Sequence, residues 1–172
     1  MQRTWLAVAA ATAVVTLGLA AIDAFGDSST DATRLVGSWS GTATATSVPL
    51  PPLKDLITFT TDGSVIEAHR AYLKESPLGP VLATPGHGSW ARSGANEYAA
   101  TLAIIYEGAP DNPTHAGTVL ATETVRFKLR VASDNTTLTG RLIDEISDLD
   151  GNVIFSGPGT FEASRIAVRP LP

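Results

Sequence analysis

The chain has 172 residues, a formal net charge of −5 at pH 7 and no cysteine. Without cysteine the protein can form no disulfide, thiolate metal site or thiol nucleophile, and it offers no N-terminal cysteine for lipid attachment. An acidic chain with scattered basic residues also argues against nucleic-acid binding. The length predicts one folded domain.

Residues 1–24 are expected to be a secretory signal peptide or an N-terminal membrane anchor. Residues 4–22 carry no charge and follow Arg3, which is typical of a signal, while their number is close to the ~20 residues that span a bilayer. Residues 25–34 are then a polar linker, and residues 35–169 form the folded domain. Both alternatives place the domain in the secreted fraction or the cell envelope (periplasmic or extracytoplasmic), and only this first segment is expected to contact a membrane.

After the linker, apolar and polar residues alternate with a period of two, which predicts β-strands. Helical periodicity is nearly absent. Eight strands are expected, at about residues 38–47, 55–61, 64–72, 88–92, 98–106, 118–131, 137–147 and 153–165. The predicted fold class is therefore all-β.

The connections between these strands alternate between long and tight. Long connections at about residues 47–53, 73–85 and 107–116 alternate with tight turns at residues 62–63, 93–96 and 133–136, and residues 150–151 make a last tight turn. In an up-and-down antiparallel arrangement, successive connections lie at opposite ends. The three long loops are therefore expected at one end, the mouth, and the first three tight turns at the other end, the floor.

Eight alternating strands joined by hairpins are expected to close into an antiparallel up-and-down barrel, because only closure removes exposed strand edges. A barrel of this size has room for packed side chains or for one small ligand. Inward-facing small residues, including Gly41, Gly157 and Gly159, favour an open cavity. The same residues would also let a filled barrel close tightly, so a filled core is the alternative.

Gly37-Ser38-Trp39 stands at the start of the first strand and resembles the Gly-x-Trp signature of lipocalins and their calycin relatives. Arg165, on the inward face of the last strand, matches the arginine that packs over this tryptophan at the closed end in that family. The resemblance implies a lipocalin-like (calycin-type) eight-stranded β-barrel, with Trp39 and Arg165 as a structural plug in the floor. Allene-oxide-cyclase-like barrels are similar in size and architecture, which keeps an enzyme as an alternative.

Glu123 is the one charged residue on an otherwise apolar strand face. A lone buried carboxylate is costly, so it must be paired, hydrated or protonated. One interpretation is a group that anchors a ligand or acts as a general acid or base. The other is a structural partner for Arg165 or for another inward polar group.

The other candidate ligand-binding residues are aromatic or titratable and lie in the mouth half or on the face that carries Glu123. They are Tyr106, Tyr72, His69, His87 and Phe127. Antiparallel pairing could bring His69 close to His87. No metal site and no cofactor are expected, because the histidines show no ligand spacing such as H-E-x-x-H.

Three hypotheses for function follow. The first is an exported lipocalin-like barrel that binds a small apolar molecule in its interior and does no chemistry. The second is a small-barrel isomerase or cyclase of an apolar substrate, with Glu123 as acid or base together with Tyr106 or His87. The third is a filled barrel that acts as an adhesion or scaffold module through its loops.

Overall fold

The structure is a computed structural model that describes residues 34–171. The predicted signal or anchor segment, residues 1–24, lies outside the described residues, as does nearly all of the predicted linker. No helix among the described residues is long and apolar enough to cross a membrane.

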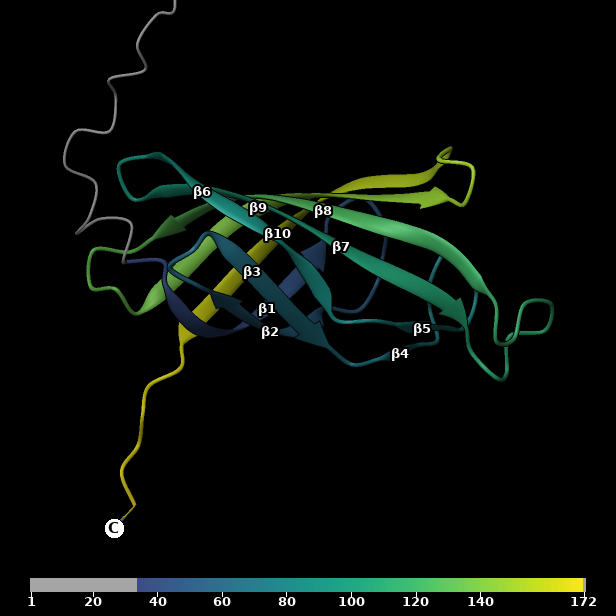
Figure 1. Cartoon of the computed structure of the whole chain (residues 1–172), viewed down its shortest axis with the longest axis horizontal. Helices are drawn as coiled ribbons and strands as arrows, with labels where there is room; N and C mark the ends of the chain where they lie inside the picture. The colour runs from purple at the N-terminus through teal and green to yellow at the C-terminus, as the bar shows by residue number, and fades with distance from the viewer. Residues whose placement is uncertain (1–33, 172) are drawn as a thin grey trace, which may run out of the picture.

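Eight of the ten strands in the described part of the chain close into a barrel (Figure 1). The strands are β1 (Gly37–Ala45), β2 (Leu53–Phe59), β3 (Ser64–His69), β4 (Tyr72–Leu73), β5 (Val81–Ala83), β6 (Gly86–Gly94), β7 (Glu97–Gly108), β8 (Val119–Val131), β9 (Thr137–Asp148) and β10 (Val153–Arg165). The ring runs β1-β2-β3-β6-β7-β8-β9-β10, and antiparallel pairing of β10 with β1 closes it. The predicted all-β, closed antiparallel barrel of eight strands is confirmed.

Strands β4 and β5 are two short additions that the sequence pattern does not predict. β3 ends at His69 rather than near residue 72, and β4 then pairs with β5. β6 pairs with β7 only as far as Ala103. β5 pairs with the end of β7, from Tyr106 to Gly108, and so supplies partners to backbone groups that β6 does not reach.

The connections separate by length as predicted. The turns between β2 and β3, β6 and β7, and β8 and β9 lie at the floor, where Gly63, Asn96 and Asn135 adopt positive φ. Glycine and asparagine tolerate this conformation best, which explains why the chain can reverse so tightly at these positions. The long connections, including β4 and β5, lie at the opposite end (Figure 1).

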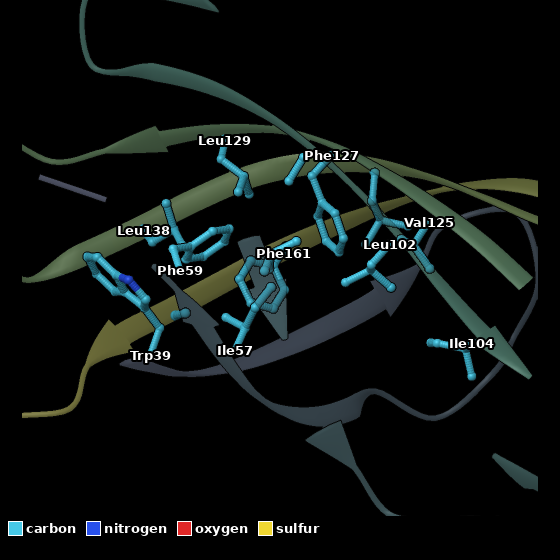
Figure 2. Packing of buried hydrophobic residues seen from close by; sticks show 14 of the residues in the cluster. Trp39, Ile57, Phe59, Leu102, Ile104, Val125, Phe127, Leu129, Leu138 and Phe161 are labelled. Carbon is cyan, nitrogen blue, oxygen red and sulfur yellow. The ribbon is translucent and has the colours of Figure 1, made fainter. Parts of the chain in front are cut away.

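The floor half of the barrel is filled with apolar side chains. Trp39 is fully buried, and its indole Nε1 donates a hydrogen bond to the Leu35 carbonyl oxygen at 2.9 Å. Aromatic rings meet edge to face, as Trp90 and Tyr98 do with 5.8 Å between their centroids, an arrangement that the ring quadrupoles favour. Figure 2 shows this packing, which includes Ile57, Phe59, Leu129, Leu138 and Phe161.

Neighbouring side chains, and not a cavity, occupy the space beside two inward glycines. A Cβ atom on Gly41 would lie 2.6 Å from Phe161 Cζ, and one on Gly159 would lie 2.8 Å from Leu142 Cδ1. A larger residue at either position would displace these side chains. The expectation that inward glycines leave room for a ligand is therefore wrong at these two positions.

Arg165 and Trp39 close the floor. The guanidinium carbon of Arg165 lies 4.1 Å from the centroid of the Trp39 ring, so the predicted contact between the two residues is present. Arg165 also donates hydrogen bonds to the carbonyl oxygens of Val36 and Asn135, both at 2.7 Å, and to that of Arg34. These bonds tie the end of β10 to the segment before β1 and to the β8–β9 turn.

Candidate functional site

The mouth half of the barrel contains a cavity of about 150 Å³. Much of its wall is apolar and comes from β7, β8 and β9, whose inward residues recur at every second position. The apolar wall residues of these three strands are Leu102, Ile104, Val125, Phe127, Leu142 and Ile146. In Figure 2 the labelled side chains run from Trp39 in the floor core toward Ile104 in the cavity wall.

The long connections complete the wall at the mouth. Leu50 and Pro51 come from the first long connection and Leu53 from the start of β2, while Leu73 and Pro77 come from the second connection and its β4 strand. Apolar loops of this kind often mark a binding surface or a lid. In this barrel they line the cavity and leave it open.

The first polar cluster in the cavity consists of Glu123, Tyr106 and Asp144. Glu123 lies on β8 between Ile104 of β7 and Ile146 of β9. Tyr106 and Asp144 stand two residues from these partners on β7 and β9, which brings all three polar side chains to adjacent inward positions. The Tyr106 hydroxyl donates a hydrogen bond to Glu123 Oε2.

Glu123 holds its proton more strongly than an ordinary glutamate. Burial is the largest cause of its raised pKa; a hydrogen bond with Asp144 and the charge of that residue raise the pKa further, while the bond from Tyr106 opposes the rise. Burial also raises the pKa of Asp144, although its hydrogen bond with Glu123 acts in the opposite direction. The two carboxyl groups therefore titrate as a pair that retains a proton. Glu123 pairs with these groups and not with Arg165, which lies at the floor.

The second polar cluster consists of Asp55, Glu67 and His69. Asp55 of β2 lies directly opposite His69 of β3, and Glu67 precedes His69 by two residues on the same strand face. His69 Nδ1 lies 2.8 Å from Glu67 Oε1. One ligand atom from each of the three residues lies within 4.8 Å of the other two. Both carboxyl groups and the imidazole are therefore gathered at one place in the cavity wall.

Burial and mutual charge shift the pKa values of this second cluster. Burial, followed by the charge of Glu67, raises the pKa of Asp55 to about 7, while the charge of His69 acts in the opposite direction. Burial tends to lower the pKa of His69, but its hydrogen bond with Glu67 and the charges of Glu67 and Asp55 raise that pKa above its ordinary value. The carboxyl groups of Glu67 and Asp55 thus stabilise the protonated, positively charged form of His69.

Four of the six predicted ligand-binding residues line the cavity, namely Glu123, Tyr106, His69 and Phe127. The other two lie outside it. The Tyr72 hydroxyl, on β4, donates a hydrogen bond at the surface to Asp111 Oδ2 at 2.7 Å. His87 lies opposite Ile66 on the exposed face of β6. β3 and β6 are indeed neighbours, but His69 points inward, so pairing does not bring the two histidines together.

Three carboxyl residues of the two polar clusters were not predicted as site residues from the sequence: Asp55, Glu67 and Asp144. Each stands two residues from a buried apolar residue on its own strand, so period-two alternation alone places all three inside. The alternation is hard to recognise at Glu67, because the adjacent apolar residues Val65 and Ile66 interrupt it. Asp144 lies in an acidic stretch that resembles a solvated turn.

Neither the models of known protein families nor the curated proteins include a match to this chain. Function must therefore be inferred from the chemistry of the cavity, since one fold supports many activities. The cavity combines a largely apolar wall with buried carboxyl groups that accept hydrogen bonds or hold protons.

Proposed function

We propose that this barrel binds a small, mainly apolar organic molecule in the mouth half of its interior, and that the molecule carries a hydrogen-bond donor such as an amine or hydroxyl. The observation that carries the proposal is the pair of carboxyl groups, Glu123 and Asp144, in a cavity whose wall is otherwise largely apolar. In such cavities apolar contact supplies affinity, and a few polar groups fix the orientation of the ligand.

The volume of the cavity limits the ligand. A cavity of about 150 Å³ has the size that accommodates a single ring such as benzene. A larger molecule would have to extend toward Leu50 and Pro77, where the long connections form the mouth. We therefore expect a compact apolar group inside the barrel, with any remaining part of the ligand at the mouth.

The acidic lining selects against anions. Five carboxyl groups line the cavity, those of Asp55, Glu67, Glu75, Glu123 and Asp144, against one guanidinium, that of Arg70. The carboxylate of a fatty acid would meet the negative charge that these groups share at low dielectric, which is unfavourable. An amine or hydroxyl finds acceptors instead. The ligand class is therefore neutral or cationic.

Export and membership of the lipocalin family are parts of the same proposal. The uncharged residues 4–22 after Arg3 support a secretory signal or anchor. Trp39 beneath the guanidinium of Arg165 supports a lipocalin-like barrel. Mass measurement of the mature protein from its host tests the first part: loss of the segment up to about residue 24 means cleavage, and an intact chain in the membrane fraction means an anchor. An intact chain in the cytoplasm would contradict export.

Three matched probes test the ligand class. Benzylamine, benzyl alcohol and benzoate each have one ring and differ in charge and in donor groups. We expect calorimetric titration of the full chain at neutral pH to detect benzylamine and benzyl alcohol but not benzoate. Binding of benzoate as tightly as benzylamine, or no binding of either donor, would contradict the proposal.

Adjacent isoleucines on β7 provide a matched pair of variants. Ile104 lines the cavity and is 4% exposed, whereas Ile105 faces outward and is 46% exposed. Ile104→Phe places a ring in the cavity, so probe binding should be lost. Ile105→Phe makes the same change on the outer face and should leave binding intact. Equal binding by both variants would place the probe outside the cavity.

Acid–base catalysis on an apolar substrate, as an isomerase or cyclase requires, is the second candidate. Glu123 favours it, because a buried carboxyl group that retains its proton is suited to act as a general acid, and Asp144 beside it offers a base. Deuterium exchange from heavy water into the carbon next to the carbonyl of a cyclic ketone would report such catalysis. Exchange that Glu123→Gln abolishes supports an enzyme; exchange at the uncatalysed rate in the unsubstituted chain argues for binding alone.

A further inference from the structure

The cluster of Asp55, Glu67 and His69 contains buried polar atoms that lack partners. Within residues 34–171, no group hydrogen-bonds to Asp55 Oδ1, Glu67 Oε2 or His69 Nε2. Asp55 is 7% exposed, Glu67 4%, and the His69 side chain 2%. Buried polar atoms nearly always have a partner in folded proteins. Unpartnered atoms on three adjacent side chains that line one cavity indicate a partner that the three residues share.

Regular strands, rather than loops, hold these three side chains in place. Asp55 and His69 are directly paired across β2 and β3, and Glu67 lies opposite Gly86 of β6. A Cβ atom at residue 86 would lie 2.9 Å from Glu67 Oε2. Glycine at this position therefore leaves room for the Glu67 carboxylate, which a larger residue would displace.

We propose that Asp55, Glu67 and His69 bind a divalent transition-metal ion. Two carboxylates and one imidazole supply oxygen and nitrogen ligands, a set suited to Zn²⁺, Fe²⁺ or Mn²⁺. With three ligands from the protein, such an ion keeps at least one coordination position open. All three residues line the cavity, so that position is available to a molecule inside it.

The ligand atoms of Asp55, Glu67 and His69 already lie near the spacing that coordination of one ion requires. The ligand atoms spread over no more than 4.8 Å, whereas tetrahedral ligands with bonds of about 2.0–2.2 Å to one ion lie roughly 3.3–3.6 Å apart. Small side-chain rotations would close this difference. Ligands must be deprotonated to bind a metal, and an ion bound through the unpartnered His69 Nε2 and Glu67 Oε2 would leave the hydrogen bond between His69 Nδ1 and Glu67 Oε1 in place.

This inference goes beyond the proposed ligand binding and does not depend on it, because the ion would contact the chain's own side chains. No local sequence motif identifies these three residues as a metal site. Its ligands come from two paired strands and meet only through the register of β2 with β3. The expectation that no metal site exists rested on the missing histidine motif, which such a site does not need.

Metal binding to the full chain, purified without a histidine tag and stripped with EDTA, tests the proposal. The probe is Co²⁺ alone, followed by its visible absorption, with Zn²⁺ as competitor and equilibrium dialysis for stoichiometry. We expect one ion per chain and ligand-field bands that Zn²⁺ abolishes. His69→Gln should weaken binding by at least ~10-fold, and Asp55→Asn should do the same.

Matched controls make the test specific. His87→Gln and Glu162→Gln, both on exposed positions, should bind Co²⁺ as the unsubstituted chain does. If circular dichroism shows that His69→Gln does not fold, Asp55→Asn tests the metal site instead. That change removes a buried charge without changing the size of the side chain. Absence of stoichiometric binding would overturn the proposal. So would equal binding by Asp55→Asn and the unsubstituted chain, or loss of binding in Glu123→Gln alone.

Discussion

The two halves of the barrel share the same eight strands, but among the described residues only the mouth half carries clusters of ionisable inward residues. In the floor half, apolar side chains pack around Trp39 and Arg165 covers them. In the mouth half, the same alternation brings carboxyl groups to a cavity of about 150 Å³. Alternation fixes only the direction in which a side chain points. One strand can therefore contribute packed apolar side chains at one end and carboxyl groups in a cavity at the other.

Strand β8 shows this change within a single element. Leu129 and Val131 are buried in the floor half, Phe127 lies at the border and Glu123 is buried in the mouth half. Burial of a carboxyl group lowers stability unless the group is fully paired, whereas burial of leucine or valine raises it. Substitutions at the two ends should therefore change stability in opposite directions.

Trp39→Ala should have the largest effect. The change removes a fully buried indole and its contact with Arg165, which should lower the free energy of unfolding by about 3–5 kcal/mol. Chemical denaturation followed by circular dichroism measures the loss. A loss below ~1 kcal/mol, the typical value for any substitution, would show that the floor is not the main source of stability.

Arg165→Lys should have the next largest effect. Lysine keeps the charge but cannot reproduce the forked donors that reach the carbonyl oxygens of Val36, Asn135 and Arg34. We expect a loss of about 2 kcal/mol in the same denaturation assay. Arg130→Lys, at an exposed position of β8, is the matched control and should change little. Equal losses in the two variants would argue against a special role for the floor plug.

Glu123→Gln should act in the opposite direction and depend on pH. The raised pKa of Glu123 means that the folded state keeps a proton which the unfolded state releases above its ordinary value of 4.5, so folded stability falls as pH rises past that value. Glutamine can still accept the Tyr106 hydrogen bond and has no charge to bury. The variant should gain on the order of 1 kcal/mol at neutral pH.

The pH profile makes that prediction specific. Below the ordinary pKa both states carry the proton, so the stability gain of Glu123→Gln should vanish in acid and grow toward neutral pH. Denaturation midpoints measured across this range give the profile. A gain that is constant with pH would show that Glu123 does not retain its proton in the folded protein.

Tyr72→Phe should have the smallest effect. The hydroxyl lies at the surface and bonds to Asp111, where water can replace the partner. Neither stability nor binding of benzylamine should change measurably, because Tyr72 lies outside the cavity wall. Weaker benzylamine binding in this variant would extend the ligand site beyond the cavity.

Much of the barrel could be predicted because local sequence determines it. The alternation through β8 and the turn residues Asn96 and Asn135 identify strands and reversals without any tertiary information. β4 and β5 could not be predicted, since two or three residues are too few to show a period. They form because β6 leaves the end of β7 without a partner.

The candidate site was predictable only in part, for a similar reason. Glu123 was found because a clear strand surrounds it with apolar neighbours. Asp55 and His69 are neighbours because of the register between β2 and β3. That register cannot be derived from the sequence of either strand alone. The partnership of Glu123 with Asp144 likewise requires the β8–β9 register. Sequence alone therefore identified single residues but not the clusters that they form.

The pairing of β10 with β1 has a consequence for folding. These strands are the last and the first of the barrel, and Arg165 bonds to carbonyl oxygens 129 and 131 residues earlier in the chain. Contacts at such separation form slowly, because closing a long loop costs entropy before any contact stabilises it. Until β10 pairs with both neighbours, β1 and β9 each present an unpaired edge. Closure of the barrel therefore requires its first and last strands to meet.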